Sequence, residues 1–206
     1  MKKVGLIGYS GHALVVAEIL NTLNIGIAGY FEKDQVKSNP LQLEYLGYER
    51  SSNFQLKARD LSLFVAIGDN TIRANILKFL IELNADISTV VSPQSIVSSS
   101  AKIDIGSLVS FGAIINPFVK IGLGVIVNTG VILEHECKIG SFSHIASGAV
   151  LAGNVCVGEN TLIGSNSSIK QGITIGNNVI VGAGSVVIKD IPDNGVWAGN
   201  PVRRIK

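Results

Sequence analysis

The segment best suited to chemistry is Leu133-Glu134-His135-Glu136-Cys137, in which a histidine lies between two carboxylates. A carboxylate beside an imidazole fixes the tautomer of the ring and makes it a better base, the usual arrangement of a general base. The alternative is a solvated corner where polar side chains are merely tolerated. A second histidine, His144, follows in Ser141-Phe142-Ser143-His144-Ile145, and a lone histidine of this kind is more often a surface residue than a ligand.

A second candidate site is the loop Gly8-Tyr9-Ser10-Gly11-His12, between an expected strand and an expected helix. At that place backbone N–H groups and the helix dipole bind phosphate. Glu32 and the Gly68-Asp69-Asn70 segment follow two further expected strands, at the edge where ligands gather. The dinucleotide fingerprint G-x-G-x-x-G is incomplete, because Leu6 occupies the place of its first glycine. The alternative is a tight turn without a ligand.

The elements that must position these residues follow a six-residue period over half of the chain. Every sixth residue from Val97 to Val187 is aliphatic, sixteen positions in all, and every sixth residue from Ala101 is nearly always small or β-branched. Neither a helix nor a regular strand has this period. A flat strand followed by a corner every six residues does, which predicts a β-helix of hexapeptide repeats.

The first 90 residues or so predict a small parallel α/β domain instead. The apolar patterns favour strands over 2–7, 25–31 and 63–67, and helices over 11–23 and 72–84, the second capped by Thr71. Residues 87–91 lead into the stack, and 34–52 form an irregular loop with a buried edge around 41–46. We expect an α/β domain over 1–92 and the β-helix with its C-terminal tail over 93–206.

Composition narrows the possible functions. The 206 residues carry a net charge of +2, and the only basic cluster is the tail Arg203-Arg204-Ile205-Lys206, so nucleic-acid binding has no support. No apolar run approaches the roughly 20 residues of a membrane span. Cys137 and Cys156 lack metal-ligand spacing, so we expect no metal site and a cytoplasmic protein with reduced cysteines.

Taken together, these motifs resemble one family over essentially the whole chain. The Gly-x-Ser-Gly-His loop, Ala66 to Arg73, the Glu-His-Glu-Cys segment, Ala152-Gly153-Asn154 and the closing segment from Gly195 to Arg204 are similar to bacterial sugar acyltransferases of the sialic acid O-acetyltransferase NeuD type. That family includes N-acetyltransferases of nucleotide-linked 4-amino-4,6-dideoxy sugars. The resemblance implies a left-handed β-helix, a homotrimer and active sites between subunits.

The resemblance also implies roles for individual residues. The base falls on His135 and its orienting carboxylate on Glu136. Acetyl-CoA contacts fall on His144, Gly153, Ser165, Gly182 and Ala183. The nucleotide sugar contacts fall on Ser10, Gly11, His12, Glu32, Asp34, Gly68 and Arg73. One departure concerns the carrier, because related enzymes often have two adjacent acidic residues where this chain has Glu32-Lys33-Asp34.

The expected reaction is direct transfer of acetyl from acetyl-CoA to the amine of a UDP- or dTDP-linked sugar used for cell-surface glycan, either O-antigen or glycoprotein. No serine or cysteine with an adjacent base is evident, which disfavours an acyl-enzyme route. Three alternatives stay open: an O-acetyltransferase for sialic acid or another sugar, a nucleotide-binding oxidoreductase, and a β-helix without catalytic activity. The incomplete fingerprint disfavours the oxidoreductase, and the Glu-His-Glu segment disfavours the purely structural protein.

Overall fold

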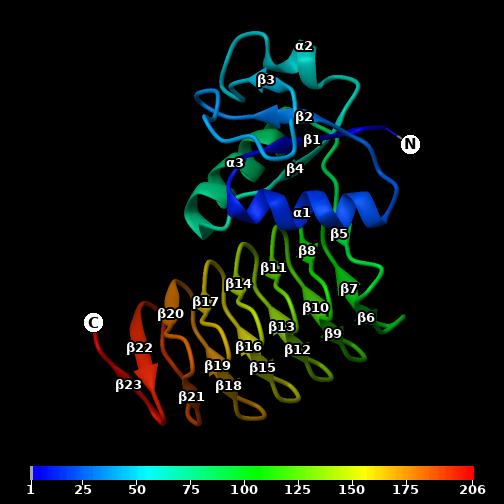
Figure 1. Cartoon of the computed structure of the whole chain (residues 1–206). Coiled ribbons are helices and arrows are strands. Elements are labelled where there is room, and N and C mark those ends of the chain that lie inside the picture. The colour runs from blue at the N-terminus through cyan, green and yellow to red at the C-terminus, as the bar shows by residue number, and fades with distance from the viewer. Residues whose placement is uncertain (1) are drawn as a thin grey trace.

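The computed structural model describes residues 2–206, and an α/β domain rests on one side of a stack of β-coils (Figure 1). The domain contains a parallel sheet in the order β3-β2-β1-β4. Its strands are β1 (Val4–Ile7), β2 (Ile27–Phe31), β3 (Tyr45–Gly47) and β4 (Ser62–Val65). Its helices are α1 (Gly11–Thr22), α2 (Phe54–Ala58) and α3 (Asn70–Glu82).

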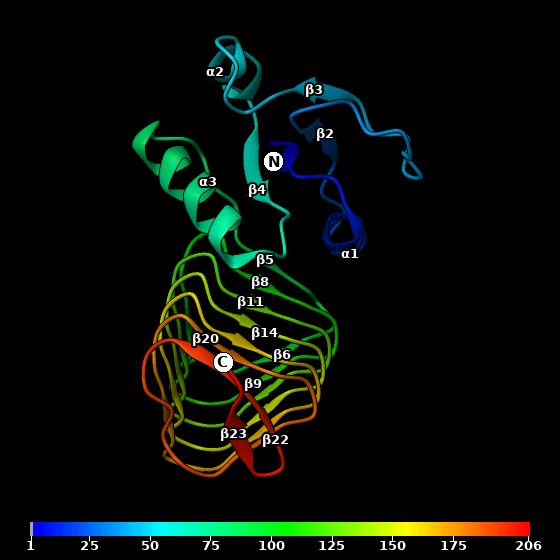
Figure 2. The same ribbon diagram turned by 90° about the vertical axis from the view of Figure 1, so that its left-hand side faces the viewer.

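Alternating side chains of the sheet pack against helices on opposite faces. Leu6 belongs to the cluster built around α1, whereas its neighbour Ile7 belongs to the cluster built around α3. This follows from the two-residue period of a strand, with both faces buried as in other parallel sheets. Viewed along the coil axis, α1 and α3 flank the sheet, and both approach the stack (Figure 2).

Most elements lie where the sequence predicts them, but three features differ. The cap of α3 is Asp69 and not Thr71: its Oδ1 accepts a hydrogen bond of 2.8 Å from the amide of Ile72, so the helix begins earlier. The loop over 34–52 includes β3, which lies at the edge of the sheet. Helix α2 was not predicted, because Phe54 is its only buried side chain.

The rest of the chain winds into coils with three flat sides, and each side is a sheet named here by its first strand; all pairings are parallel except the one between β22 and β23. The β5 sheet contains β5 (Val90–Val91), β8 (Leu108–Val109), β11 (Ile126–Val127), β14 (His144–Ile145), β17 (Leu162–Ile163), β20 (Val179–Val181) and the C-terminal hairpin β22 (Gly195–Gly199) and β23 (Val202–Arg204). The β6 sheet contains β6 (Ile96–Val97), β9 (Ile114–Ile115), β12 (Ile132–Leu133), β15 (Val150–Leu151), β18 (Ser168–Ile169) and β21 (Val186–Val187). The β7 sheet contains β7 (Lys102–Ile103), β10 (Lys120–Ile121), β13 (Lys138–Ile139), β16 (Cys156–Val157) and β19 (Thr174–Ile175).

Successive coils stack in register, eighteen residues apart. Lys120 pairs with Lys102 on one side and Lys138 on the other. The repeated aliphatic positions point into the prism: Val109, Val127 and Ile145 are all fully buried. The six-residue period is thus the period of one side and one corner, as predicted. At the C-terminal end, Trp197 of the hairpin packs against this core.

The domain and the stack share a continuous apolar contact. Outward-pointing Val90, Leu108 and Ile126 of the β5 sheet are buried in the same cluster as α1. Strand β5 pairs with β8, so the stack already begins at Val90, before residue 93. Within residues 2–206, no helix combines the length and apolarity needed to cross a membrane.

Candidate active site

His135 and Glu136 form a hydrogen-bonded pair at the corner between β12 and β13. The distance from His135 Nδ1 to Glu136 Oε2 is 3.1 Å, and the two side chains are 52% and 61% exposed. Glu136 has a left-handed backbone (φ 63°), which directs the chain around the corner. When Nδ1 carries the ring proton and donates it to Glu136, the lone pair of Nε2 is left free to accept a proton.

Gly153 lies against the imidazole of His135, one coil further along the stack. A Cβ on Gly153 would lie 2.5 Å from Nε2 of His135, closer than carbon and nitrogen tolerate. The amide of Asn154 donates to the carbonyl of His135 at 2.8 Å, which holds the two corners in register. The position of the ring therefore depends on the absence of a side chain at residue 153.

His144 and His12 form a second, half-buried pair where the domain meets the β5 sheet. Their ring centroids are 6.5 Å apart. Burial, followed by the charge of Arg73, lowers the pKa of His12 to about 4, and the same causes lower the pKa of His144 to about 4. Both rings are therefore neutral at pH 7. Nε2 of His144 lies 3.2 Å from the side-chain nitrogen Nδ2 of Asn128.

Nε2 of His12 is one of three buried side-chain polar atoms without a hydrogen-bond partner in the described residues, with Oδ1 of Asn160 and Nε1 of Trp197. Orphaned buried nitrogens are costly in folded proteins, and a bound polar group relieves the cost. His12 is the last residue of the predicted phosphate loop and lies in the first turn of α1.

Ser10, Gly11 and Gly68 lie at the carboxyl ends of β1 and β4, as predicted. The side chain of Ser10 makes no capping bond to α1, and neither glycine has any atom within 4 Å of where a Cβ would stand. A pocket of about 300 Å³ borders the loop that connects β1 to α1. Its lining residues are Tyr9, Ser10, Gly11, Leu14, Val36, Ser38 and Pro40. A second pocket, of about 250 Å³, adjoins Gly68, the N-terminus of α3 and His144.

The two acidic residues after β2 differ in their surroundings. Glu32 accepts hydrogen bonds from the amides of Tyr9 and Lys33, both at 3.2 Å, so it braces the loop that leads to Ser10. Asp34 is exposed. Glu32 therefore contacts the loop that connects β1 to α1, whereas Asp34 lies at the surface.

Arg73 departs from the expectation of a nucleotide ligand. Its side chain is 1% exposed, and five N–H donors are matched by five acceptors at 2.7 to 3.1 Å. These acceptors are the carbonyls of Gly124, Ile67, Gly68 and Phe142 and the side-chain oxygen of Asn70. Burial lowers the pKa of Arg73 to about 10, so it stays charged. Arg73 joins α3 to two successive corners of the stack, and its donors are occupied.

The expected acetyl-CoA residues lie at three places around the prism. Ser165, Gly182 and Ala183 come together at the corner between the β5 and β6 sheets, where the amide of Gly184 donates to the carbonyl of Ser165 at 2.8 Å. Gly153 lies at the corner of His135, and His144 lies on the β5 sheet. A single chain therefore does not bring all five residues together.

The His135–Glu136 pair is also separated from His12 and His144 within one chain. His135 lies at the corner between the β6 and β7 sheets, whereas the α/β domain, His12 and His144 lie along the β5 sheet. In a three-sided prism, that corner is opposite the β5 sheet (Figure 2). Within one chain, His135 and residues 10–12 therefore lie on different sides of the prism.

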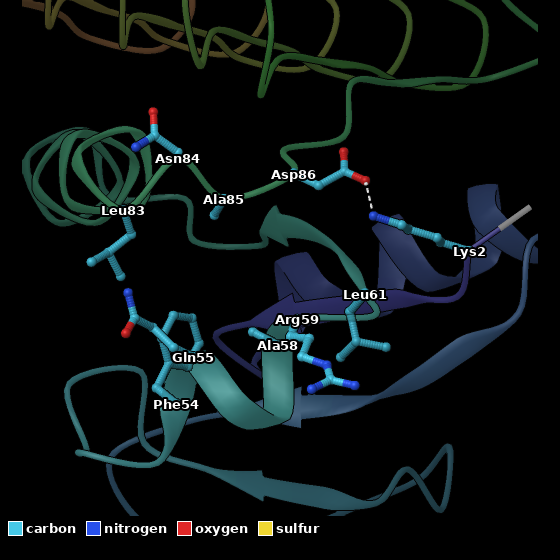
Figure 3. A pocket seen from close by; sticks show the side chains of 10 residues that line it. All are labelled: Lys2, Phe54, Gln55, Ala58, Arg59, Leu61, Leu83, Asn84, Ala85 and Asp86. Atoms are coloured by element: carbon cyan, nitrogen blue, oxygen red, sulfur yellow. Dashed lines mark hydrogen bonds and ion pairs between the residues drawn. The ribbon is translucent and has the colours of Figure 1, made fainter.

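The pocket beside α2 contains none of the predicted site residues. It measures about 290 Å³, lies between α2 and the end of α3, and is bordered by the Lys2–Asp86 ion pair of 3.0 Å (Figure 3). Across the described part of the chain, no group of three or more His, Cys, Asp or Glu side chains is placed to hold a metal ion.

Sequence reasoning missed three residues beside His144. Leu162 and Ile180 line the 250 Å³ pocket, and Asn128 contacts the imidazole. Steps of eighteen residues from His144 lead to Leu162 and Ile180, so the coil length, once known, predicts them. No sequence signal points to Asn128.

Comparison with known proteins agrees with this architecture. Residues 3–80 match the family model "PglD N-terminal domain", and residues 154–189 match "Hexapeptide repeat of succinyl-transferase". A search of curated protein sequences gives no match. Among solved structures, the acetyltransferase domain of PglB from Neisseria gonorrhoeae is 32% identical, with 100% of both chains covered and a TM-score of 0.94.

A histidine-to-asparagine variant of perosamine N-acetyltransferase from Caulobacter crescentus, solved with CoA and GDP-perosamine, is also 32% identical. The alignment covers 100% of this chain and 98% of that one, with a TM-score of 0.94. The chain belongs to the NeuD-type sugar acyltransferase family. Membership in this family confirms the predicted fold class, an α/β domain followed by a left-handed β-helix of hexapeptide repeats.

Proposed function

We propose that this protein transfers the acetyl group of acetyl-CoA to the amine of a nucleotide-linked 4-amino-4,6-dideoxy sugar. The observation that carries the proposal is the exposed His135–Glu136 pair, in a chain that matches a perosamine N-acetyltransferase along its whole length. The PglB acetyltransferase domain, 33% identical, has been solved with acetyl-CoA. The product serves a cell-surface glycan, and the reaction takes place in the cytoplasm, where acetyl-CoA and nucleotide sugars are made.

The chemistry is a direct acyl transfer with His135 as the base. The amine attacks the thioester carbonyl, a C–N bond forms, and the C–S bond breaks as CoA leaves. Nε2 of His135 takes the proton that the amine loses and returns it to the departing thiolate. Glu136 holds the proton on Nδ1 through the 3.1 Å contact, so that Nε2 stays available.

The nucleotide sugar binds to the α/β domain, residues 1–92 in our division of the chain. Ser10, Gly11 and Gly68 leave open space at two helix N-termini, a favourable setting for a diphosphate. His12 supplies an unpaired, neutral ring nitrogen at the same place. Glu32 supports the loop, and Asp34 is near enough in sequence to reach the base or ribose.

Acetyl-CoA binds along the stack, residues 93–206, between neighbouring copies. His144, Gly153, Ser165, Gly182 and Ala183 are its contacts in this proposal. They lie at two corners and on one side of the prism. This spread favours a long ligand bound between two neighbouring prisms over a ligand bound in a pocket of one chain.

The working unit is a homotrimer with three sites at subunit boundaries. The β6 sheet supports this assembly with an outward apolar row, of which Ile96 is 67% exposed. The opposite placement of His135 and the nucleotide loop supports shared sites, because one copy supplies the base and its neighbour presents the sugar.

A thiol-release assay tests the proposal. Acetyl-CoA is offered with UDP-, dTDP- and GDP-linked amino sugars, and the product is examined by NMR to locate the acetyl group. We expect thiol release with at least one nucleotide amino sugar and an amide product. Acetylation of a hydroxyl would establish the O-acetyltransferase alternative, and thiol release with free amino sugars alone would remove the nucleotide site.

A further inference from the structure

Phe118 is an aromatic residue that neither its backbone nor the core explains. It occupies a corner between the β6 and β7 sheets with a left-handed backbone (φ 62°), a conformation that glycine and asparagine adopt most readily. At the same corner position the next coil has Glu136, also left-handed (φ 63°), and the two coils after it have the preferred residue types, Asn154 and then Gly172. The side chain of Phe118 is 64% exposed, and among residues 2–206 it joins none of the three hydrophobic clusters.

Phe142 is a second phenylalanine at a left-handed corner, and it is covered by the α/β domain. It has the same φ of 62°, at a corner between the β7 and β5 sheets. There the α/β domain covers it: Phe142 is 7% exposed, packs in the α3 cluster and lies 5.4 Å from the Lys78 ammonium. The corner of Phe118 has the same backbone and ring type, but the chain supplies no comparable cover.

Phe118 is next to the catalytic pair. The amide of Glu136 donates to the carbonyl of Pro117 at 3.0 Å, so the corner of Phe118 stacks directly on the corner of His135 and Glu136. The flanking strands confirm the register, since Ile114 pairs with Ile132 and Lys120 with Lys138. Neighbouring coils are about 4.8 Å apart. A ligand whose amine reaches His135 therefore lies within reach of the Phe118 ring.

The two sides of His135 are unlike each other. On the C-terminal side, Gly153 lies against the imidazole and presents no side chain. On the N-terminal side, Pro117 and Phe118 present an exposed apolar surface. Because acetyl-CoA is assigned to the Gly153 side, the Phe118 side is left for the acceptor.

We propose that Phe118 determines acceptor specificity by packing against the C6 methyl group of the 4-amino-4,6-dideoxy sugar. This inference rests on the proposed function. In such a sugar the methyl-bearing C5 is bonded to the amine-bearing C4, so an amine held at His135 brings the methyl group close to it. Aromatic rings are preferred linings for apolar groups in ligand sites, and a 6-hydroxyl gains nothing from that contact.

The test compares two acceptors on one carrier, a 4-amino-4,6-dideoxyhexose and its 6-hydroxy counterpart. Wild type should prefer the 6-deoxy sugar. In Phe118→Ala the KM for this sugar should rise about tenfold, the scale of one apolar group, while kcat and the KM for acetyl-CoA change little. The preference over the 6-hydroxy sugar should disappear, and Phe118→Tyr should restore it. Leu56→Ala, which removes a side chain of similar exposure (71%) on α2, is the matched control.

Sedimentation of each variant separates this role from a subunit contact. A loss of trimer mass in Phe118→Ala, with both acceptors affected equally, would make Phe118 an assembly residue and overturn the inference. An unchanged KM at unchanged mass would also overturn it. Failure of the proposed function is seen earlier and separately, because wild type would then acetylate neither acceptor.

Discussion

At the scale of single residues, the exposed His135–Glu136 pair sets the first prediction. Because both side chains are more than half exposed, His135→Ala should leave the fold intact. Turnover should fall by about 10² to 10⁴, the range for a lost general base. Glu136→Gln should lose less, since it only orients the ring. Steady-state kinetics beside a circular dichroism spectrum measures both effects, and near-native turnover in His135→Ala would assign the base elsewhere.

Gly153 gives a second residue-scale prediction, because a Cβ there would lie 2.5 Å from Nε2 of His135. Gly153→Ala should push the imidazole from its place and lower kcat at least tenfold, since small misplacements of a base are costly. Gly172→Ala is the control. A Cβ on this exposed residue meets no atom within 4 Å, so the variant adds backbone strain (φ +73°) without touching the imidazole. Equal kcat in wild type and Gly153→Ala would show that the ring is not held by this contact.

At the scale of elements, Arg73 fastens α3 to the stack. Arg73→Met leaves the carbonyls of Gly124 and Phe142 without their charged donor, so we expect a loss of about 3 kcal/mol in unfolding free energy. Lys78→Met, which removes an exposed cation from the same helix, should cost less than 1 kcal/mol. Urea unfolding of both variants makes the comparison, and equal losses would contradict a fastening role for Arg73.

The contact between α1 and β14 predicts a pH dependence, because His12 and His144 have pKa values near 4 when folded and 6.5 ordinarily. As pH falls below 6.5, the unfolded chain binds protons that the folded chain does not, so stability decreases. At pH 5 the loss is about 2 kcal/mol for each ring. The double variant His12→Gln/His144→Asn should lose less stability between pH 7.5 and pH 5 than wild type. Parallel losses in urea unfolding would show that the rings are not held neutral.

What the sequence predicts of these elements depends on how often a signal repeats. The stack was predictable because every coil needs aliphatic side chains at the same positions to fill the prism, as Val109 and Val127 do. Strand β3 was not, since it depends on a distant pairing with β2. For Arg73, the sequence shows a cation after a Gly-Asp-Asn loop but not which carbonyls surround it. The His135–Glu136 contact was predictable because the two residues are adjacent.

At the scale of the whole molecule, the shared sites of the proposed trimer predict complementation between two inactive variants. His135→Ala removes the proposed base, and His12→Ala damages the proposed nucleotide-binding loop. In mixed trimers, boundaries that combine an intact His135 with an intact His12 from the neighbour regain activity. Random mixing makes about a quarter of the sites complete. Co-expression followed by the thiol-release assay measures this recovery. Activity no greater than the sum of the two variants, in trimers shown by mass to be mixed, would place each site within one chain.

The contacts of Arg73 limit where the stack can gain an extra coil. Arg73 binds the corners at Gly124 and Phe142, which begin and end the single coil that carries His135. Eighteen residues inserted within that coil would separate the two anchor points by about 4.8 Å and detach one of them. The same insertion after Ile163 adds a coil beyond both anchors. The chain can therefore grow at its C-terminal end, one coil at a time, while the coil with His135 keeps its place under the α/β domain.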